Sequence, residues 1–366
     1  MRIVINRESL LEPLIQAGGV VERRQTLPIL ANVLVQATGD LLAITATDLE
    51  VELRTEARAS CEAGGSFTIP ARKLLDICKA LPANADILID TDGEKAVIRS
   101  GRSRFTLGLL PAQDYPTIEP SVAVQTFSVE QRVLKRLIEK TQFAMAQQDV
   151  RYYLNGLLLE AQQGALRAVA TDAHRLALCE VLSPSIEDIE FQVIVPRKAV
   201  LELSRLLGDG GEIATVELSN NHVRIHTPEL IFTSKLIDGK YPDYRRVIPA
   251  PSDNALTVDK ERFRQALTRA SILSNEKYRG IRFKLKPGVM ELLAHNPEQE
   301  EAEEELEIAY AGEELVIGFN VGYLLDALGT IEQDTVEVDL RDSNSSALIR
   351  GVGVEDSRYV VMPMRL

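Results

Sequence analysis

The residues with the most obvious capacity for chemistry are Asp172 and His174, because a carboxylate beside an imidazole can transfer protons. An internal comparison argues against this use. A similar stretch around Asp48 keeps the Thr-Asp pair but has no histidine, so the fold does not require His174, which belongs to a local site or to none. A nuclease that uses the pair stays an alternative, although it lacks a second carboxylate or a metal cluster.

Other candidate groups also fail to form a site. His222 and His226 are spaced like a metal pair on a helix, but apolar residues alternate with them, which predicts a strand. The cysteines are odd in number and have no C-x-x-C spacing, so we expect buried thiols at Cys61, Cys78 and Cys179. There is no nucleophile elbow or P-loop. We therefore predict a protein without catalysis, metal or cofactor.

Composition sets broad limits. With 366 residues, 45% hydrophobic and 26% charged, the chain suits a folded protein of several domains. The 41 basic residues against 54 acidic residues give a net charge of -13, which argues against coating nucleic acid by bulk attraction. No apolar run approaches the ~18 residues of a membrane span, and no signal core follows the start. We expect a cytoplasmic protein with no membrane contact.

The elements that must position these residues recur along the chain. The strand that leads to Asp48 is echoed by the one that leads to Asp172, and the strand that ends at Pro70 is echoed by one that ends at Pro196, at intervals of roughly 125 residues. A third copy is fainter: residues 256–263 match 127–134. We therefore predict three domains of one fold, at 1–120, 127–245 and 246–366.

Within each copy the periodicity alternates between strand and helix. An N-terminal strand leads to a helix with an apolar stripe, as at Val129, Val133 and Leu137. Short strands follow, and a strand that ends in or near proline enters a second helix. Each domain thus belongs to the α+β class, with two helices on antiparallel sheet and six helices in the chain.

Positive charge gathers on these helices. Four of the six, over 72–81, 129–140, 197–207 and 259–269, carry a net charge of +2, and Arg132, Arg136 and Lys140 share one face. An ordinary solvated face is the alternative. Six globules of about 120 residues in a closed hexagon leave a hole of roughly 35 Å, which is wide enough for duplex DNA. One chain cannot form this hexagon, but a head-to-tail pair can.

The residues also resemble a known family, the beta subunit, or sliding clamp, of bacterial DNA polymerase III. The similar segments span the chain, at 26–30, 101–105, 148–156, 171–176, 241–246, 275–280, 296–304 and 359–366. The resemblance implies a ring-shaped homodimer that encircles double-stranded DNA, is loaded by a clamp loader and confers processivity on DNA polymerases. It implies no catalysis. A three-domain scaffold that binds only proteins is the alternative.

The resemblance implies three sets of site residues. Those that approach DNA are Arg24, Arg72, Gln148, Arg151, Tyr152, Tyr153 and Lys198, although one of the two tyrosines can instead fill the core. Those of a dimer interface are Lys73, Arg102, Arg104, Phe105 and Leu107 in the first domain, facing Ile272, Leu273, Glu300, Glu301, Glu303 and Glu304 in the third domain of the partner. On composition alone, the acidic run is an exposed loop.

The third set forms an apolar cleft for short linear peptides of polymerases, the clamp loader and repair proteins. Its residues are Leu154, Thr171, His174, Arg175, Leu176, Pro242, Arg246, Val247, Asn320, Tyr323, Ser346, Val360, Val361, Met362, Pro363, Met364 and Arg365. A buried C-terminal strand is the alternative for the last of these. Three positions depart from the family pattern: Ala173 replaces a common Gly, Tyr278 a common Phe, and Asn344 an apolar residue.

Overall fold

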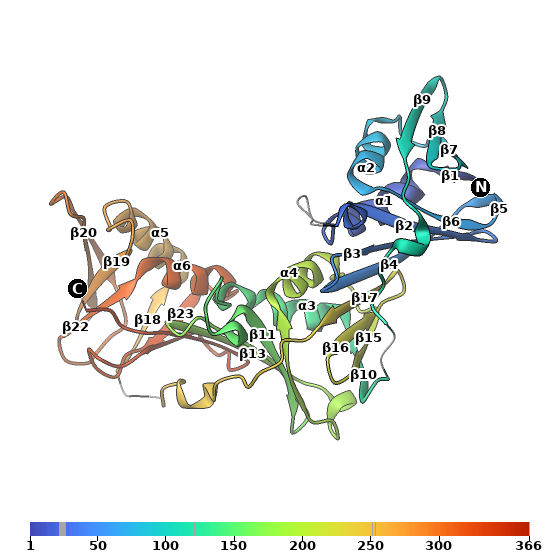
Figure 1. The fold of residues 1–366 in the computed structure, drawn as a ribbon. Helices are drawn as coiled ribbons and strands as arrows, with labels where there is room; N and C mark the ends of the chain where they lie inside the picture. The colour runs from blue at the N-terminus through green and yellow to red at the C-terminus, as the bar shows by residue number, and fades with distance from the viewer. Residues whose placement is uncertain (22–26, 120–121, 251, 253, 366) are drawn as a thin grey trace. The chain divides into compact units, whose positions relative to one another are not determined.

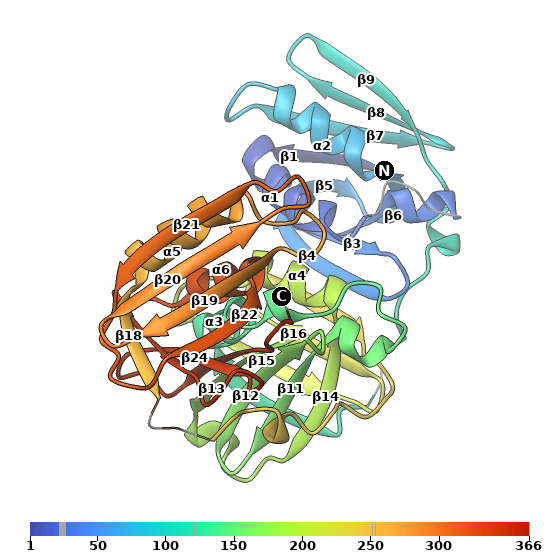
Figure 2. The same ribbon diagram turned by 90° about the vertical axis from the view of Figure 1, so that its left-hand side faces the viewer.

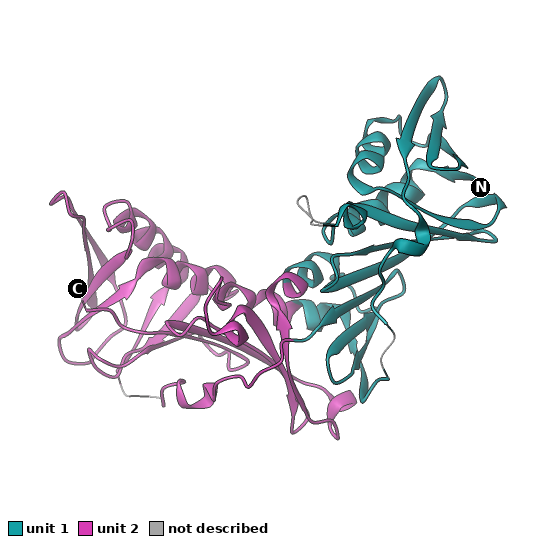
Figure 3. Cartoon of the chain, viewed as in Figure 1, with its two compact units in different colours: residues 1–135, 201–236 teal, residues 136–200, 237–366 magenta. Residues whose placement is uncertain are grey.

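The computed structural model describes residues 1–366 except 22–26, 120–121, 251, 253 and 366. Two units are distinguished in Figure 3: residues 1–135 with 201–236 form unit 1, and residues 136–200 with 237–366 form unit 2. The described residues include six α-helices, and their strands pair antiparallel, which confirms the predicted α+β class (Figure 1). In this part of the chain no helix is long and apolar enough to cross a bilayer.

Unit 1 contains two sheets. The first has the order β5-β1-β7-β8-β9, from β1 (Arg2–Asn6), β5 (Ser60–Ala63), β7 (Asp86–Asp92), β8 (Lys95–Ser100) and β9 (Ser103–Gly108). The second has the order β10-β15-β16-β17-β4-β3-β2-β6, from β2 (Asn32–Thr38), β3 (Leu41–Thr47), β4 (Val51–Arg58), β6 (Gly65–Pro70), β10 (Gln125–Glu130), β15 (Ile213–Leu218), β16 (His222–His226) and β17 (Leu230–Lys235). Helices α1 (Arg7–Gly18) and α2 (Ala71–Ala80) pack against each other, and α1 packs along β4 (Figure 2).

Unit 2 also contains two sheets. One has the order β14-β11-β12-β13-β25-β24-β23-β18, from β11 (Gly156–Gln162), β12 (Ala165–Thr171), β13 (Arg175–Leu182), β14 (Phe191–Pro196), β18 (Ala255–Asp259), β23 (Thr335–Asp339), β24 (Ala347–Gly351) and β25 (Ser357–Val361). The other has the order β21-β20-β19-β22, from β19 (Gly280–Lys286), β20 (Val289–His295), β21 (Glu301–Glu307) and β22 (Leu315–Asn320). Helix α5 (Lys260–Ser271) packs along β20 and β21 and against α6 (Val321–Thr330) (Figure 2).

Local sequence explains these elements. Helix α2 buries Leu74 and Cys78, four residues apart, and so places one apolar stripe on the core. Side-chain caps begin other helices: Asp259 accepts from the backbone N–H of Arg262 at 2.8 Å, and Asn6 accepts from Glu8 at 3.0 Å. Two helices, α3 (Gln131–Glu139) and α4 (Arg197–Leu206), contain residues of both units.

The units do not follow the sequence repeats, because two strand pairs cross repeat boundaries. We call the pair β4–β17 in unit 1 the first junction and the pair β13–β25 in unit 2 the second junction. Leu230 lies opposite Thr55 in the first, and the equivalent residues Ser357 and Cys179 lie opposite each other in the second. Each junction merges half of one repeat with half of the next in a continuous eight-stranded sheet.

Candidate functional site

The turn that carries Asp172 and His174 is held by its own polar groups. The backbone N–H groups of His174 and Arg175 donate to Asp172 Oδ1 at 2.9 and 3.0 Å. Thr171 Oγ1 donates to the carbonyl of Arg175 at 2.6 Å and accepts from the N–H of Ala173 at 3.1 Å. The Asp172 carboxylate therefore stabilises the turn. This structural role argues against the alternative of a nuclease that uses Asp172 and His174 as an acid/base pair. Among the described residues, no group of three or more potential metal ligands gathers.

The first repeat folds the same turn without a histidine. Asp48 Oδ1 accepts from the N–H groups of Glu50 and Val51 at 2.9 and 2.7 Å. Leu49 has a φ of 78° there, and Ala173 has a φ of 73° in the equivalent place. Since the left-handed region favours glycine, a non-glycine residue is strained at both positions.

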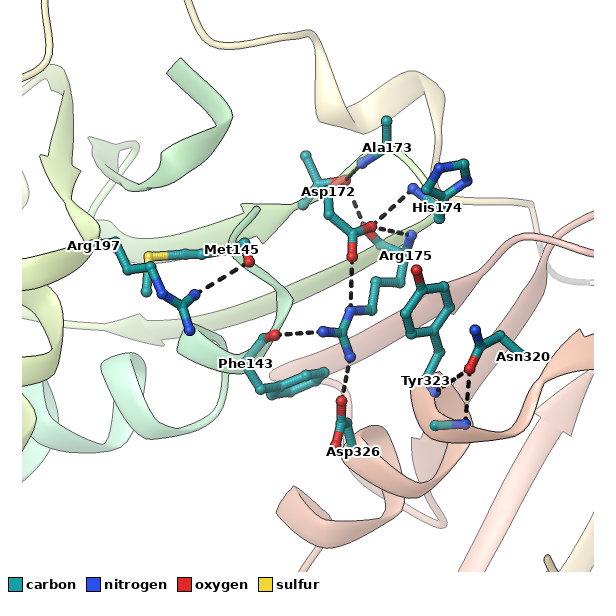
Figure 4. A network of polar contacts seen from close by, with 12 residues as sticks. Phe143, Met145, Asp172, Ala173, His174, Arg175, Arg197, Asn320, Tyr323 and Asp326 are labelled. Carbon is teal, nitrogen blue, oxygen red and sulfur yellow. Dashed lines mark hydrogen bonds and ion pairs between the residues drawn. The ribbon is translucent and has the colours of Figure 1, made fainter. Parts of the chain in front are cut away.

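Arg175, at the start of β13, connects three segments of unit 2 (Figure 4). Its Nε donates to Asp172 Oδ2 at 3.1 Å, and its Nη2 donates to the carbonyl of Phe143 at 2.7 Å. Its Nη1 donates to Asp326 on α6, and the ring centroid of Tyr323 lies 4.5 Å from the guanidinium carbon. Only 12% of its side chain is exposed. Arg175 therefore braces the predicted cleft, with its donors already engaged.

An apolar cluster forms the floor beside this turn. Buried residues from β11, β12, β13, β14, β24 and β25 meet the segment that follows residue 240, in a set made of Leu158, Val169, Leu176, Leu178, Ile194, Tyr241, Tyr244, Leu348 and Val360. Tyr153 and Val247 pack against it and are only partly buried. The structure thus brings together predicted cleft residues that lie far apart in sequence. Thr171 and Leu154 are buried as well.

The C-terminal run divides into a buried and an exposed part. Val360 and Val361 are each 1% exposed and belong to β25, so the alternative of a buried C-terminal strand is correct for them. Met362 is 36% exposed, and its N–H donates to the carbonyl of His174 at 2.9 Å. Met364 donates to the carbonyl of Gly318 at 2.7 Å. We call residues 362–365 the C-terminal arm, and it lies at the surface of unit 2.

One wall of the predicted cleft is held in place by a buried carboxylate. Glu160 on β11 is 4% exposed and accepts from Tyr244 Oη at 2.8 Å and from Arg245 Nη2 at 2.7 Å. Burial and this acidic neighbour raise the pKa of the Tyr244 hydroxyl. These contacts hold the segment that carries Pro242 and Arg246, both exposed. Sequence reasoning missed Glu160, because an isolated glutamate in an apolar strand carries no motif.

Residues of the third repeat complete the predicted set. The Asn320 side chain caps α6 by accepting from the N–H groups of Gly322 and Tyr323 at 2.9 and 3.3 Å (Figure 4). Burial raises the pKa of the Tyr323 hydroxyl. Ser346 is partly buried, whereas the nearby Asn344 is exposed. A cavity of about 390 Å³ adjoins the C-terminal arm, lined by Asn275, Tyr278, Gly280, His295, Asn296, Pro297, Met364 and Arg365.

The residues predicted to approach DNA occupy varied environments. Arg24 lies outside the described residues. Arg72 and Gln148 are exposed, and Lys198 is partly buried. Arg151 is paired with Asp149 through Nη2 at 2.8 Å, and this contact lowers the pKa of Asp149 to about 2. Tyr152 is 58% exposed, whereas Tyr153 packs against the apolar cluster, as the alternative of one core ring predicts.

The basic face predicted on α3 is largely used within the protein. Arg136 pairs with Asp356 at 2.9 Å, and Lys140 pairs with Glu332 at 2.7 Å, both across the second junction. Lys140 is only 8% exposed. The three residues therefore do not form an unpaired basic face, because carboxylates of the third repeat pair with two of them. Arg132 is exposed and pairs with Glu130.

The two sides of the predicted dimer interface are sheet edges. Arg104 is exposed on β9, and Phe105 and Leu107 are half-buried on the opposite face of that strand. Ile272 is 75% exposed and Leu273 half-buried. On the other edge, β21 exposes Glu301 and Glu303 and turns Glu304 inward. The remaining members, Lys73, Arg102 and Glu300, are exposed.

The structure also shows the environments of the acidic run, the cysteines and the two histidines on 222–226. Glu304 is paired with Arg269 of α5 at 2.6 Å, so it is not an unpartnered member of the acidic run. Cys78 and Cys179 are buried, and burial raises the pKa of the Cys78 thiol to about 12, but Cys61 is only partly buried. Residues 222–226 form β16, as the alternation predicted.

Comparison with known proteins covers the whole chain. Residues 1–119, 128–243 and 245–365 match the N-terminal, central and C-terminal domains of the DNA polymerase III beta subunit. The beta sliding clamp of Pseudomonas putida is 55% identical over 368 residues, and that of Escherichia coli K12 is 47% identical, each match covering 100% of both chains.

Solved structures agree. The sliding clamp of Pseudomonas aeruginosa bound to griselimycin superimposes with a TM-score of 0.97 at 53% identity, and the polymerase III beta subunit of Caulobacter crescentus with a TM-score of 0.94 at 41% identity. Both matches cover 100% of this chain and 100% of the other.

Proposed function

The chain belongs to the family of the DNA polymerase III beta subunit, the beta sliding clamps, and we propose that it works as a head-to-tail homodimer that encircles duplex DNA. It is a non-catalytic processivity factor of DNA replication, with DNA and polymerases as partners. We place the domain boundaries at 1–120, 127–245 and 246–366. The cytoplasm, where bacterial DNA is replicated, is the proposed location.

The sheet edges carry the dimer proposal. The two junctions follow one rule. A strand from the middle of one repeat pairs with the final strand of the next repeat: β4 pairs with β17, and β13 pairs with β25. By the same rule β21 should pair with β9, and these two strands are edge strands of their sheets. An edge strand has unpaired backbone groups that can bind a further strand. In a head-to-tail dimer, β21 of one copy meets β9 of the second copy.

Internal equivalence also supplies the register. Ser103 on β9 is equivalent to Leu230 in the first junction and to Ser357 in the second. Glu304 on β21 is equivalent to their partners, Thr55 and Cys179. Ser103 then lies opposite Glu304 of the partner copy. We call this expected β9–β21 pair the third junction.

The register explains the charges and the apolar residues of both edges. It sets Arg104 opposite Glu303 on one face of the sheet, where opposite charges attract. On the other face it sets Phe105 where Tyr359 stands in the second junction. Tyr359 there lies 5.9 Å from the ring of Phe143, whose equivalent in the third repeat is Ile272. The exposed Ile272 thus acquires an apolar partner when the dimer forms.

We propose two further surfaces. Arg24, Arg72, Gln148, Arg151, Tyr152, Tyr153 and Lys198 approach DNA, with cations on phosphates and Tyr152 available to stack on an unpaired base. Short linear peptides of polymerases, the clamp loader and repair proteins bind over the apolar cluster of unit 2. Leu176 and Val360 contribute to its floor, and the exposed Pro242, the partly buried Val247 and the C-terminal arm provide anchors. Two methionines in the arm suit a surface that accepts many sequences.

The test of encirclement compares topologies of one DNA. Clamp loaded onto a nicked circle by its loader should co-elute with the circle in gel filtration and be lost once a restriction enzyme linearises it. Clamp on an uncut circle given the heat-killed enzyme is the control. Retention on linear DNA with free ends would contradict encirclement, and absence of DNA association in either form would support a scaffold that binds only proteins.

A further inference from the structure

The C-terminal end of helix α6 receives a cation from its own repeat. Lys260, the first residue of α5, donates through Nζ to the carbonyl of Ile331 at 2.9 Å. The first repeat does the same, since Arg7, the first residue of α1, donates through Nε to the carbonyl of Cys78 near the end of α2 at 2.7 Å. Such cations satisfy orphan carbonyls and complement the helix dipole.

Helix α6 also receives a second cation, from the neighbouring repeat across the second junction. Lys140, just after α3, donates through Nζ to the carbonyl of Thr330, the last residue of α6. It also pairs with Glu332, two residues beyond the helix, at 2.7 Å. Its side chain is 10% exposed, so this contact is shielded from solvent. The end of α6 is thus held from two repeats at once.

Arg269 is the equivalent of Lys140 in the third repeat. Residues 256–263 match 127–134, which places Lys140 in register with Arg269 on α5. The equivalent of α6 beyond the third junction is α2 of a second copy, a helix of the same length. Within the described part of one chain, the end of α2 has the cation Arg7 and no second one from a neighbouring repeat.

The geometry of Arg269 allows it to donate a hydrogen bond to the C-terminal end of α2 in a second copy. Its Nε and Nη2 donate to Glu304 on β21 at 2.7 and 2.6 Å, which orients the guanidinium toward the sheet edge and leaves Nη1 for another acceptor. This contact lowers the pKa of Glu304. The Arg269 side chain is 54% exposed in the single chain, close in sequence to the exposed Ile272.

We infer that Arg269 of each subunit donates to the C-terminal carbonyls of helix α2 in the partner subunit, and that Glu304 positions it for this contact. The inference rests on the proposed dimer. Arg269 is thus the counterpart, between subunits, of the Lys140 contact within the chain. The end of α2 then receives two cations, Arg7 and Arg269, as the end of α6 receives Lys260 and Lys140.

The first experiment measures subunit exchange. Full-length dimers carrying donor or acceptor dyes at their N-termini are mixed, and the rise in energy transfer gives the dissociation rate. Arg269→Ala should raise this rate roughly five- to tenfold, in line with a cation at a helix C-terminus. The matched control is Arg264→Ala, an exposed arginine of the same helix paired with Glu261, which should change the rate less than about twofold.

A second experiment tests the partner helix itself. Pro82 lies two residues after α2, where Glu332 lies two residues after α6. Pro82→Glu should recreate the Lys140–Glu332 pair between subunits and slow exchange roughly threefold, and this gain should vanish when Arg269→Ala is added. Pro82→Gln serves as the uncharged control.

The outcomes separate this inference from the dimer proposal. A wild-type chain that sediments as a monomer would overturn the dimer, and Arg269 would then have no partner helix. A wild-type dimer whose exchange rate is unchanged by Arg269→Ala would overturn the role of Arg269 alone. A gain from Pro82→Glu that persists without Arg269 would likewise refute the contact. Loss of the gain in the double variant supports it.

Discussion

The first and second junctions share a backbone plan but differ in the side chains at their outer ends. Both are antiparallel strand pairs in the same register, and both begin at a Thr-Asp turn that its own side chains stabilise. In the first junction the position after the turn carries Glu52, which accepts from the N–H of Ile118 at 2.8 Å. In the second, the equivalent position is the buried Leu176.

At this position the first junction therefore carries a carboxylate and the second an apolar side chain. Burial raises the pKa of the Glu52 carboxyl, and the hydrogen bond that it accepts from Ile118 holds the last residues of the first domain against the junction. The corresponding segment of the second domain, which carries Tyr244, is held by Glu160. This carboxylate lies on β11 and not on the junction strand β13. The floor around Leu176 and Val247 is left apolar. The same backbone plan therefore carries either a hydrogen-bonded carboxylate or an apolar floor at this position.

The strongest test transfers the first junction's chemistry into the second. Leu176→Glu buries an unpaired carboxylate in the apolar cluster and should lower the free energy of unfolding by about 4 kcal/mol, measured by urea denaturation. The reciprocal Glu52→Leu removes one accepted hydrogen bond and should cost about 1 kcal/mol. Equal costs at the two junctions would contradict the proposed difference.

The next test removes the arm that only the second junction has. Deletion of residues 362–366 should reduce binding of polymerase and loader peptides roughly 100-fold, measured by fluorescence anisotropy, because exposed anchors dominate peptide affinity. Sedimentation should still show a dimer, since β25 ends at Val361 and keeps its core. Undiminished peptide affinity would remove the cleft from the proposal.

A third test extends the comparison to the third junction. Arg104→Glu should weaken the dimer roughly tenfold by setting a like charge opposite Glu303, and combining it with Glu303→Arg should restore part of the loss. Analytical ultracentrifugation over a dilution series measures both. A single variant that remains as tight a dimer as wild type would place the interface elsewhere.

The smallest effect probes what the two junctions share. Ala173 and Leu49 both have φ near +75°. Ala173→Gly should raise the free energy of unfolding by about 0.5–1 kcal/mol, because glycine adopts this conformation without a side-chain clash. Leu49→Gly should act in the same direction. A clear loss of stability in either variant would show that the side chain contributes more than the turn costs.

Much of the fold was predictable from local patterns. The alternation at 222–226, the apolar stripe of α2 and the three matching segments each depend on neighbouring residues, and the α+β class with two helices per repeat followed from them. The residues of the site were predictable chiefly through family resemblance. Their environments were not, because burial and pairing depend on residues far away in sequence.

Specific residues show the limit. Arg136 and Lys140 read as a basic face in sequence, but Asp356 and Glu332, some two hundred positions away, neutralise them. Val360 is a candidate binding residue in the sequence, but only the structure shows that it pairs with Leu176 in the sheet. The role of Glu160 is likewise visible only in the structure, where it accepts a hydrogen bond from the Tyr244 hydroxyl.

By itself, the sequence determined the repeat, the type of each element and the turns, because these depend on the spacing of apolar and capping residues within a few positions. Only the tertiary structure decided which strand edges join and which remain open. It also decided which charges are engaged inside the chain and which remain for a partner. These outcomes depend on distances between separate repeats, and a Coulombic or hydrogen-bonded contact forms only when folding brings its two groups within a few ångströms.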